Sequence, residues 1–407
     1  EKYSGLLKEN INKHFWDEKQ GCYTCYLYPE YLGYRPTQRV GVMSNGLAAV
    51  LDIATTGQSI QMVENFPLYP YGAAVLYPSI PDDFSYHNKS VWPVWETPYM
   101  YAARDVKNTK VVEHMIKSLV RAGALFLTHK ENMTYDTGYD CGTALNSSRQ
   151  LWSVASYISM VYRVLFGMTM EEEGITFTPV VPDLVAGKIS LENFRYRDAV
   201  LNINITGKGN TVKKITVNGQ DQKLPYLLPA TAQGDYTIDI VMTATHASDK
   251  MNLVQPGPRE DWSPMEPVLE QKGQIINCPV ESGLRYFLCG TKIEDKEITF
   301  PYDLSRESAG FYSVYSVDKR GFKSDCSNPV IKTDWREIFE AEDAVSKGTF
   351  SNVHSGYSGK GFVVDLYTKP ADVAFTIDVP ADGDYALVLS GANGHGPDGS
   401  YCTIRSV

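Results

Sequence analysis

Two glutamates in the first third of the chain are candidates for acid–base chemistry. Glu96 lies one turn inside a predicted helix that opens with Trp92-Pro93, and the neighbouring Trp95 can provide an apolar wall that raises the pKa of its carboxyl group. Glu131 lies at the mouth of a long loop. Each also has an ordinary structural explanation, because Glu96 can interact with the dipole of its helix and Glu131, next to Lys130, can be a solvated loop carboxylate.

Aromatic and amide side chains just before Glu96 are candidates for substrate contacts. Trp92 could stack on the apolar C–H face of a sugar ring, or it could pack into the core. His87 and Asn88 can donate and accept hydrogen bonds with hydroxyl groups, although a lone histidine is more often structural. The candidate substrate-binding residues in this part of the chain are Tyr86, His87, Asn88, Trp92, Trp95, Arg149 and Gln150, while Trp152 is more readily explained as core.

The composition limits the classes of partner. The chain has 407 residues and a formal charge of −10, with 43% hydrophobic residues, which is enough apolar material for two to four domains of ~150 residues. The negative charge argues against a nucleic-acid or anionic-membrane partner. No apolar run is long enough for a transmembrane helix. Because the chain begins at Glu1 within a helical pattern, we expect a processed or truncated piece, so the absence of a signal peptide does not bear on export.

The seven cysteines do not form a disulfide framework, because they are few for this length and odd in number. Cys22 and Cys25 form a C-x-x-C pair, but no second pair and no nearby histidine accompanies it. Half-buried cysteines are therefore favoured over a zinc site. No other group of residues has the spacing of metal ligands, and we expect no cofactor for catalysis.

The first 167 residues are predicted to be helical. Apolar residues recur with helical spacing in five segments, and Gly167 is a suitable stop for the last of them. These segments are 3–15, 42–54, 91–106, 111–127 and 150–166. The long loops between them, at 21–39, 66–89 and 128–149, exceed the usual length of connections, which is typical of functional loops.

Short strands replace the helices from Gly174 onwards. Alternating residues predict strands at 175–177, 201–205, 214–217 and 236–240, and we expect an antiparallel β-domain with turns at 207–210 and 218–219. A linker rich in proline, glycine and charge follows. The next β-module looks like a fibronectin type III or immunoglobulin-like sandwich, and a third begins near Phe339.

Two stretches of the helical region resemble a known group of enzymes. The first contains Tyr77-Pro78 and then Tyr86-His87-Asn88-Lys89-Ser90-Val91-Trp92-Pro93, and the second is Glu131 followed nineteen residues later by Gln150-Leu151-Trp152-Ser153. Together they resemble the C-terminal half of the six-hairpin, (α/α)6-barrel glycosidases, such as glycogen-debranching enzymes and α-rhamnosidases. The chain departs from that pattern with Lys89 in place of glycine and Leu151 in place of alanine.

The resemblance implies glycoside hydrolysis by two carboxyl groups, one donating a proton to the leaving oxygen and the other activating water. In these families the acid lies in the earlier half of the barrel and the base in the later half. Glu131 is then the leading candidate for the base and Glu96 the second. The sequence predicts about half of the helices of a complete barrel, so the missing N-terminal half is an expected partner. An oligo- or polysaccharide substrate and export to the periplasm or cell surface are further implications.

The last part of the chain resembles galactose-binding-like carbohydrate-binding modules. The resemblance rests on Phe339-Glu340-Ala341-Glu342-Asp343-Ala344, Gly356-Tyr357-Ser358-Gly359 and Asp382-Gly383-Asp384-Tyr385. In that family paired glutamates help to bind a structural calcium ion, which makes Glu340 and Glu342 candidate ligands. Asn393 lies near the family's sugar site, or it is a turn asparagine.

The predicted fold class is multidomain, α then β. Part of an (α/α)6 barrel at 1–170 is followed by a β-sandwich at 171–246, a fibronectin- or immunoglobulin-like module at 247–336 and a partial jelly roll at 337–407. Two alternatives to a glycoside hydrolase remain. One is a polysaccharide lyase on an α/α toroid that uses Tyr86 with His87, and the other is a non-catalytic glycan-binding scaffold.

Overall fold

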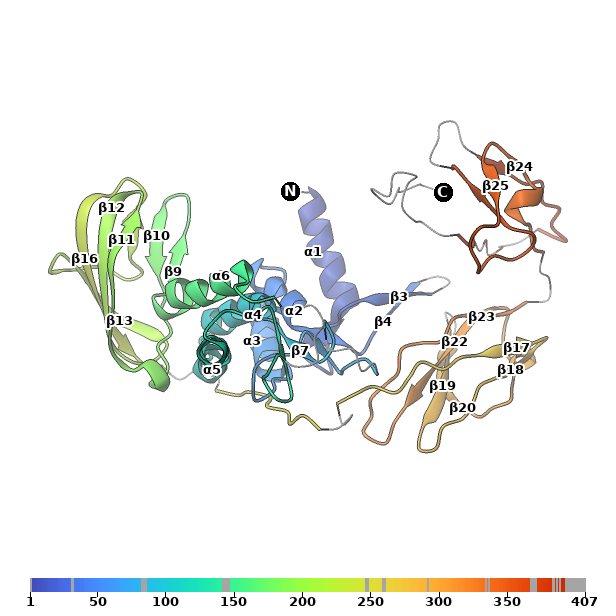
Figure 1. Cartoon of the computed structure of the whole chain (residues 1–407), viewed down its shortest axis with the longest axis horizontal. Coiled ribbons are helices and arrows are strands. Elements are labelled where there is room, and N and C mark those ends of the chain that lie inside the picture. Colours follow the sequence, from blue (N-terminus) through green and yellow to red (C-terminus); the bar gives the residue numbers. More distant parts are fainter. Residues whose placement is uncertain are drawn as a thin grey trace. The chain divides into compact units, whose positions relative to one another are not determined.

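The computed structural model describes most of the chain (Figure 1). The described residues are 2–30, 33–81, 86–140, 147–245, 249–257, 261–290, 293–333, 335, 337–366, 372–382, 385, 387 and 389–391. The chain divides into two compact units, the first made of residues 1–304 and 312–330 and the second of residues 305–311 and 331–407. Within the described residues, no helix combines the length and the apolar character needed to cross a membrane.

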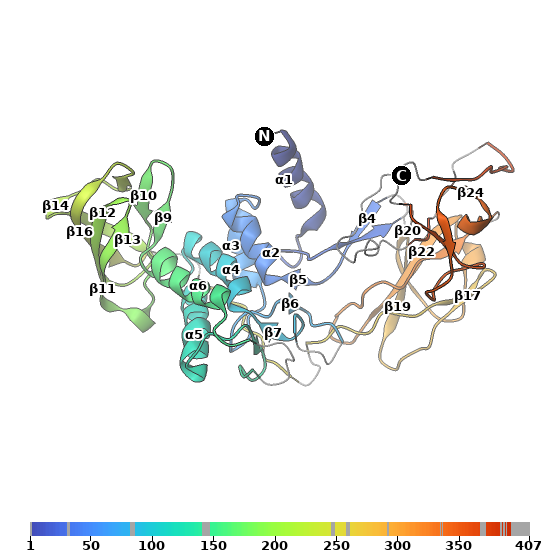
Figure 2. The ribbon, with the colours of Figure 1, turned by 45° about the horizontal axis from the view of Figure 1, so that its top comes forward.

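Helices come first in the chain, as expected. They are α1 (Lys2–Phe15), α2 (Val42–Val50), α3 (Thr56–Asn65), α4 (Pro93–Asp105), α5 (Thr109–Phe126) and α6 (Leu151–Ser159), and α6 continues as the π-helical segment η1 (Met160–Leu165). Helices α2, α3, α5 and α6 pack against α4, as Figure 2 shows. Glycine is required at Gly46 of α2, because a Cβ atom there would lie 2.3 Å from the backbone nitrogen of Tyr99 in α4. The described helices do not close a barrel.

The helix starts show why the sequence predicted most of these elements. Pro93 occupies the first turn of α4, where its missing N–H costs nothing. The Asn108 side chain caps α5 by accepting a hydrogen bond from the backbone N–H of Val111 at 3.0 Å. All five predicted helical segments are confirmed, and in each at least one end lies one or a few residues from its predicted position.

The sequence reasoning missed α3, although its start carries a readable signal. The Thr55 side chain accepts a hydrogen bond from the Gln58 backbone N–H at 3.2 Å, and the Thr55 backbone N–H donates to Gln58 Oε1 at 2.9 Å. This reciprocal pair is a capping box, which satisfies two N–H groups that a helix start leaves without partners.

Thr55→Ala is expected to weaken the first turn of α3 by about 1 kcal/mol, because the cap is lost while the exposed surface hardly changes. Amide hydrogen exchange in that turn should become roughly fivefold faster. The N-cap of α5 in the same molecules serves as an internal control and should be unaffected. Unchanged exchange at Gln58 would mean that packing against α4, and not the cap, holds α3 in place.

Two sheets follow the helices. The smaller has the order β15-β10-β9, and the larger has the order β11-β12-β16-β13-β14. Their strands are β9 (Met168–Met170), β10 (Gly174–Phe177), β11 (Gly187–Tyr196), β12 (Asp198–Gly207), β13 (Thr211–Val217), β14 (Gln220–Asp221), β15 (Leu227–Pro229) and β16 (Gln233–Thr243). Alternate residues such as Leu201 and Ile203 of β12 and Ile238 of β16 are buried in a core that also contains Ile175 of β10.

The expected all-antiparallel arrangement of this region is wrong in one pairing. Strands β12 and β16 are parallel, with Leu201 opposite Tyr236 and Ile203 opposite Ile238. The 207–210 segment is therefore no hairpin, because β16 lies between the strands that it connects. The Asn218-Gly219 turn is confirmed: β13 and β14 pair directly across it, and both turn residues have positive φ. A two-residue turn motif determines the pairing of the two strands that it connects, whereas the pairing of β12 with β16 depends on residues far apart in the sequence.

The next module also consists of two sheets around one core. Their strand orders are β17-β18-β21 and β20-β19-β22-β23. The strands are β17 (Glu270–Lys272), β18 (Ile275–Asn277), β19 (Arg285–Gly290), β20 (Ile293–Ile298), β21 (Tyr302–Asp303), β22 (Gly310–Val317) and β23 (Val330–Lys332). Ile276 of one sheet and Leu288 and Val314 of the other are fully buried together. The two sheets share this core, and the fibronectin- or immunoglobulin-like fold of the module stays a prediction.

A buried arginine ties this module to the helical region within the first unit. The Arg39 guanidinium is 2% exposed and donates to Pro78 O at 2.8 Å, to Ser263 Oγ at 2.9 Å and to Asp325 Oδ2 at 3.0 Å. Backbone hydrogen bonds from Ser79 N–H to Asp261 O and from Ser263 N–H to Ser79 O run alongside. The strand-like segment 261–263 is thus fixed at its position.

Short strand pairs order the long loops of the helical region. They are β1 (Trp16–Asp17) with β2 (Cys22–Tyr23), β3 (Leu27–Glu30) with β4 (Gly33–Pro36), β5 (Val40–Gly41) with β6 (Leu76–Tyr77), and β7 (Ser90–Val91) with β8 (Met133–Thr134). Cys22 is buried and Cys25 half-buried, and neither forms a disulfide. Burial raises the pKa of both thiols to about 12.

The second unit contains short elements. They are η4 (Ala341–Asp343), β24 (Val345–Ser346), β25 (Thr349–Ser351), β26 (Phe362–Val364) and β27 (Val373–Ala374), with β24 antiparallel to β27 and β25 antiparallel to β26. The expected jelly roll stays a prediction, as do the predicted domain boundaries.

Candidate functional site

Three chain segments come together around Glu131. Its backbone N–H donates to Ser147 O at 3.0 Å, and the Gln150 N–H donates to His129 O at 2.9 Å, so the segments 129–131 and 147–150 run side by side. Strand β7 pairs with β8, which adds the loop at 86–93. The two stretches that carry the resemblance are therefore neighbours in space.

Glu131 is 6% exposed, and its carboxylate has two polar neighbours. Gln150 Nε2 donates to Glu131 Oε1 at 3.2 Å. Burial, the negative charge of Glu131 and a hydrogen bond to its carboxylate raise the pKa of Tyr86. The carboxylate is thus an oriented acceptor held between an amide and a phenol, and it is not a solvated loop side chain.

An aromatic cluster adjoins this carboxylate, and we define it as Tyr86, His87, Trp92, Trp95 and Trp152. The ring centroids of Tyr86 and Trp92 are 5.0 Å apart, those of His87 and Trp95 are 5.8 Å apart and nearly parallel, and those of Trp92 and Trp152 are 5.9 Å apart. Trp92 is 1% exposed and packs in the interior, whereas His87 is exposed and Trp152 is 42% exposed. The rings that can meet a ligand are those at the edge of the cluster.

Trp152 was not among the candidate substrate-binding residues. The signal that could have indicated a substrate contact was its position two residues after Gln150. Gln150 is the N-cap residue of α6, so Trp152 lies in the first turn of that helix, close to Gln150. The sequence explained Trp152 as core. The structure leaves two fifths of it exposed at the edge of the aromatic cluster.

Asn88 has a structural task in this loop. Its Oδ1 accepts from the Ile80 backbone N–H at 2.9 Å, and its Nδ2 donates to the Ile80 carbonyl at 2.8 Å. It is 7% exposed. Its neighbour Lys89 stands where the resembled motif has glycine and adopts φ 56°, a left-handed conformation that suits glycine better. Lys89 Nζ lies 3.7 Å from the centroid of the Trp262 ring.

Glu96 is 1% exposed, and both of its carboxyl oxygens are occupied. The Ala73 backbone N–H donates to Oε1 at 2.7 Å, and Ser118 Oγ lies 3.0 Å from Oε2. Burial raises the pKa of Glu96 to about 8, against the opposite effect of these two hydrogen bonds. A Cβ atom on Gly72 would lie 2.4 Å from Oε1, so the carboxyl is enclosed on that side as well. This position favours a structural role.

The other candidates lie outside this arrangement. Arg149 is exposed at φ 58°, and its backbone N–H donates to Thr128 Oγ1. Asn393 lies outside the described residues. Of the metal candidates, Glu342 Oε1 accepts from the backbone N–H groups of Lys360 and Gly361, and Glu340 Oε2 accepts from Ser358 Oγ. A hydrogen bond from its own backbone, together with those from Lys360 and Gly361, lowers the pKa of Glu342.

Glu340 and Glu342 therefore face the same loop, at 358–361. Across the described part of the chain, no group of three or more His, Cys, Asp or Glu side chains is arranged to hold a metal ion. A calcium site can also use backbone oxygens, so the assignment of these two residues as ligands stays a prediction.

Comparison with known proteins gives one partial similarity to report. No protein-family profile matches the chain. Over 59 residues, the chain is 44% identical to a cycloisomaltooligosaccharide glucanotransferase of Niallia circulans. That stretch is 14% of this chain and 6% of the other protein, so the similarity concerns a small part of both.

Proposed function

We propose that this chain is part of a carbohydrate-active enzyme that hydrolyses glycosidic bonds, with Glu131 as the general base. The observation that carries the proposal is the nearly buried Glu131 carboxylate, which is held by Gln150 and Tyr86 beside an aromatic cluster with exposed edges. The similarity to a glucanotransferase supports the broader class of carbohydrate-active enzyme.

The chemistry fits this arrangement. In an inverting glycosidase the base carboxylate removes a proton from water as the water attacks the anomeric carbon. The base and acid carboxyl groups lie ~6.5–9.5 Å apart. Gln150 and Tyr86 keep the Glu131 carboxylate oriented, and the exposed edges of His87 and Trp152 offer apolar surface to the C–H face of a sugar ring. The enclosed Glu96 is a poor choice for the acid, because it is 1% exposed and both of its carboxyl oxygens are hydrogen-bonded.

The remaining parts of the proposal rest on resemblance. The acid would come from an N-terminal half that completes a six-hairpin barrel with the helices described above. The second unit would bind saccharides, with Glu340 and Glu342 as calcium ligands and Asn393 near the sugar. Such an enzyme would act in the periplasm or at the cell surface on an oligo- or polysaccharide.

Product analysis of the complete protein tests the proposal. The protein is incubated with neutral and acidic glycans, including isomaltooligosaccharides, and the products are separated by chromatography and mass. Shorter chains with new reducing ends and one added water are expected. Unsaturated uronic-acid products would instead identify a lyase, and longer chains without net hydrolysis would identify a glucanotransferase. Binding without any product would identify a glycan-binding scaffold.

A further inference from the structure

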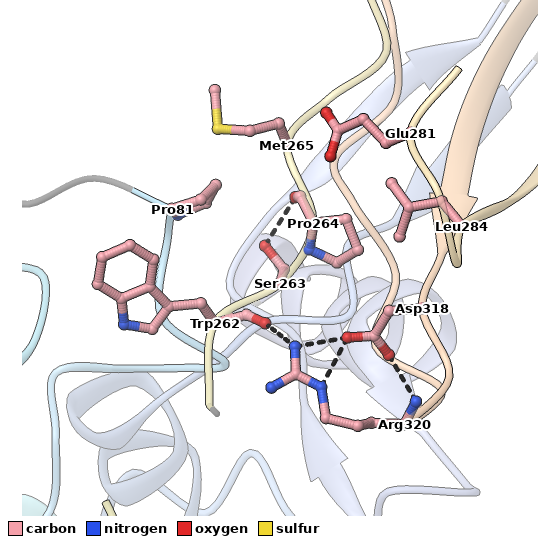
Figure 3. A pocket seen from close by; sticks show the side chains of 9 residues that line it. All are labelled: Pro81, Trp262, Ser263, Pro264, Met265, Glu281, Leu284, Asp318 and Arg320. Atoms are coloured by element: carbon pink, nitrogen blue, oxygen red, sulfur yellow. Dashed lines mark hydrogen bonds and ion pairs between the residues drawn. The ribbon is translucent and has the colours of Figure 1, made fainter. Parts of the chain in front are cut away.

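A pocket in the first unit has no role in the function proposed above. It has a volume of about 350 Å³, at the lower end of the ~300–1,000 Å³ of small-molecule sites. Its lining combines apolar side chains with charged ones, and the residues that matter here are Trp262, Met265, Glu281, Leu284, Asp318 and Arg320 (Figure 3). We infer that this pocket is a second saccharide-binding site, which takes a neutral sugar unit of the glycan and rests on the proposed carbohydrate function.

Trp262 provides the apolar platform. In Figure 3 it lies with Pro81 on one side of the pocket, opposite Glu281 and Leu284. Its ring is half-buried, and Lys89 Nζ lies 3.7 Å from its centroid. The flanking backbone is fixed by the hydrogen bonds of Ser79 with Asp261 and Ser263. The backbone that carries the indole is therefore fixed before a ligand arrives, which lowers the entropy cost of binding.

The polar groups of the pocket are also fixed in advance. Arg320 Nε donates to Asp318 Oδ2 at 2.7 Å, and Arg320 Nη2 donates to Trp262 O at 2.8 Å. The Asp318 side chain is 10% exposed and that of Arg320 is 34% exposed, so the guanidinium is the more accessible of the pair. Glu281 is exposed, while its backbone N–H donates to the Tyr286 hydroxyl at 2.9 Å.

This set of groups suits a neutral sugar better than a charged one. A sugar ring presents an apolar C–H face to the indole and hydroxyl groups to carboxylate acceptors and guanidinium donors. Glu281 and Asp318 outnumber Arg320, so the pocket carries a formal charge of −1. A phosphate or a uronic acid is less suited to the pocket, because the guanidinium of Arg320 is already paired with Asp318 and the neighbouring cation, Lys89, contacts the Trp262 ring.

One residue of the candidate active-site loop contacts the tryptophan that lines the pocket. Lys89, which contacts Trp262, belongs to the same 86–93 loop as Tyr86, His87 and Trp92. A second binding site on the same unit would raise the local concentration of a long substrate near the active site, whereas a short substrate would gain nothing from it.

Affinity measurements on the full chain test the inference, with dextran, soluble starch and cello-oligosaccharides as neutral probes and polygalacturonate as the acidic one. Trp262→Ala is expected to weaken binding to the preferred neutral probe about tenfold, or ~1.4 kcal/mol. Leu284→Trp, which fills the pocket without removing the contact with Lys89, should have the same effect. Tyr3→Ala, at an exposed aromatic side chain of α1 in the first unit, is the control and should bind like wild type.

The outcomes separate this inference from the proposed function. Unchanged binding in both pocket variants, no wild-type binding to any neutral probe, or a preference for polygalacturonate would each overturn the inference. Glu131→Gln is expected to bind the neutral probe with wild-type affinity while losing turnover. If binding depends on Trp262 and the wild-type protein makes no product, the site stands and the proposed hydrolase fails.

Discussion

Glu131→Gln is expected to lower kcat about 10²–10⁴-fold, which is the usual contribution of a general acid or base. Glutamine has nearly the same shape, its carbonyl oxygen can still accept from Gln150 Nε2, and its NH2 group can donate to the Tyr86 hydroxyl oxygen, so the loop contacts should persist. An amide cannot take the proton from an attacking water. The loss should therefore appear in kcat on the substrate found by product analysis, with little change in KM.

A carboxylate in the same loop supplies the control for that measurement. Asp140 forms an ion pair with Lys130 at 2.7 Å and is partly exposed. Ion pairs of this kind contribute little to the stability of the folded protein. Asp140→Asn should leave kcat within about twofold of wild type. If Glu131→Gln folds normally and retains full turnover, Glu131 is not the base, and the aromatic cluster would need a different catalytic partner.

Glu96→Gln is expected to flatten the dependence of stability on pH. The pKa of Glu96 is raised to about 8 in the folded chain, above the ordinary value of 4.5 in the unfolded chain. Between these values the folded state keeps a proton that the unfolded state has lost. The stabilisation is full below pH 4.5 and falls as the pH rises towards 8, by about 1.4 kcal/mol per unit. The total change is on the order of 5 kcal/mol.

The hydrogen-bond pattern agrees with a proton on this carboxyl group. Ser118 has one hydroxyl proton, but its oxygen lies 3.0 Å from Tyr71 O and 3.0 Å from Glu96 Oε2. If Glu96 Oε2 carries the proton, it donates to Ser118 Oγ, and the Ser118 hydroxyl donates to Tyr71 O. A glutamine amide can donate in the same direction while its oxygen accepts from the Ala73 N–H, so glutamine should fit the site.

Urea unfolding at pH 5 to 8, followed by hydrogen exchange in α4, measures this effect. Wild type should lose stability in α4 as the pH rises, whereas Glu96→Gln should lose much less and become the more stable of the two near pH 8. Glu113→Gln is the control, because Glu113 pairs with Lys117 on the surface of α5. Parallel pH profiles for wild type and Glu96→Gln would show that Glu96 is ionised in the folded protein.

Local signals in the sequence determined much of the fold. The apolar spacing of 111–127, the proline at the start of α4 and the Asn218-Gly219 turn each act over a few residues, and the elements they predict are present. The capping box of Thr55 and Gln58 was equally local, so α3 was readable although it was missed. The stretch at 86–93 and the pair Glu131 and Gln150 were instead singled out by their resemblance to the motifs of six-hairpin glycosidases.

Only the tertiary structure decided what those residues contact. The two glutamates look alike in sequence, yet Glu96 is enclosed by Gly72, Ala73 and Ser118, whereas Glu131 is held at the edge of the aromatic cluster. The parallel pairing of β12 with β16 and the meeting of Trp262 with Lys89 also join distant residues. The physical reason is that helix caps and turns are satisfied by near neighbours in the chain, whereas burial and side-chain pairing depend on segments that only the folded chain brings together.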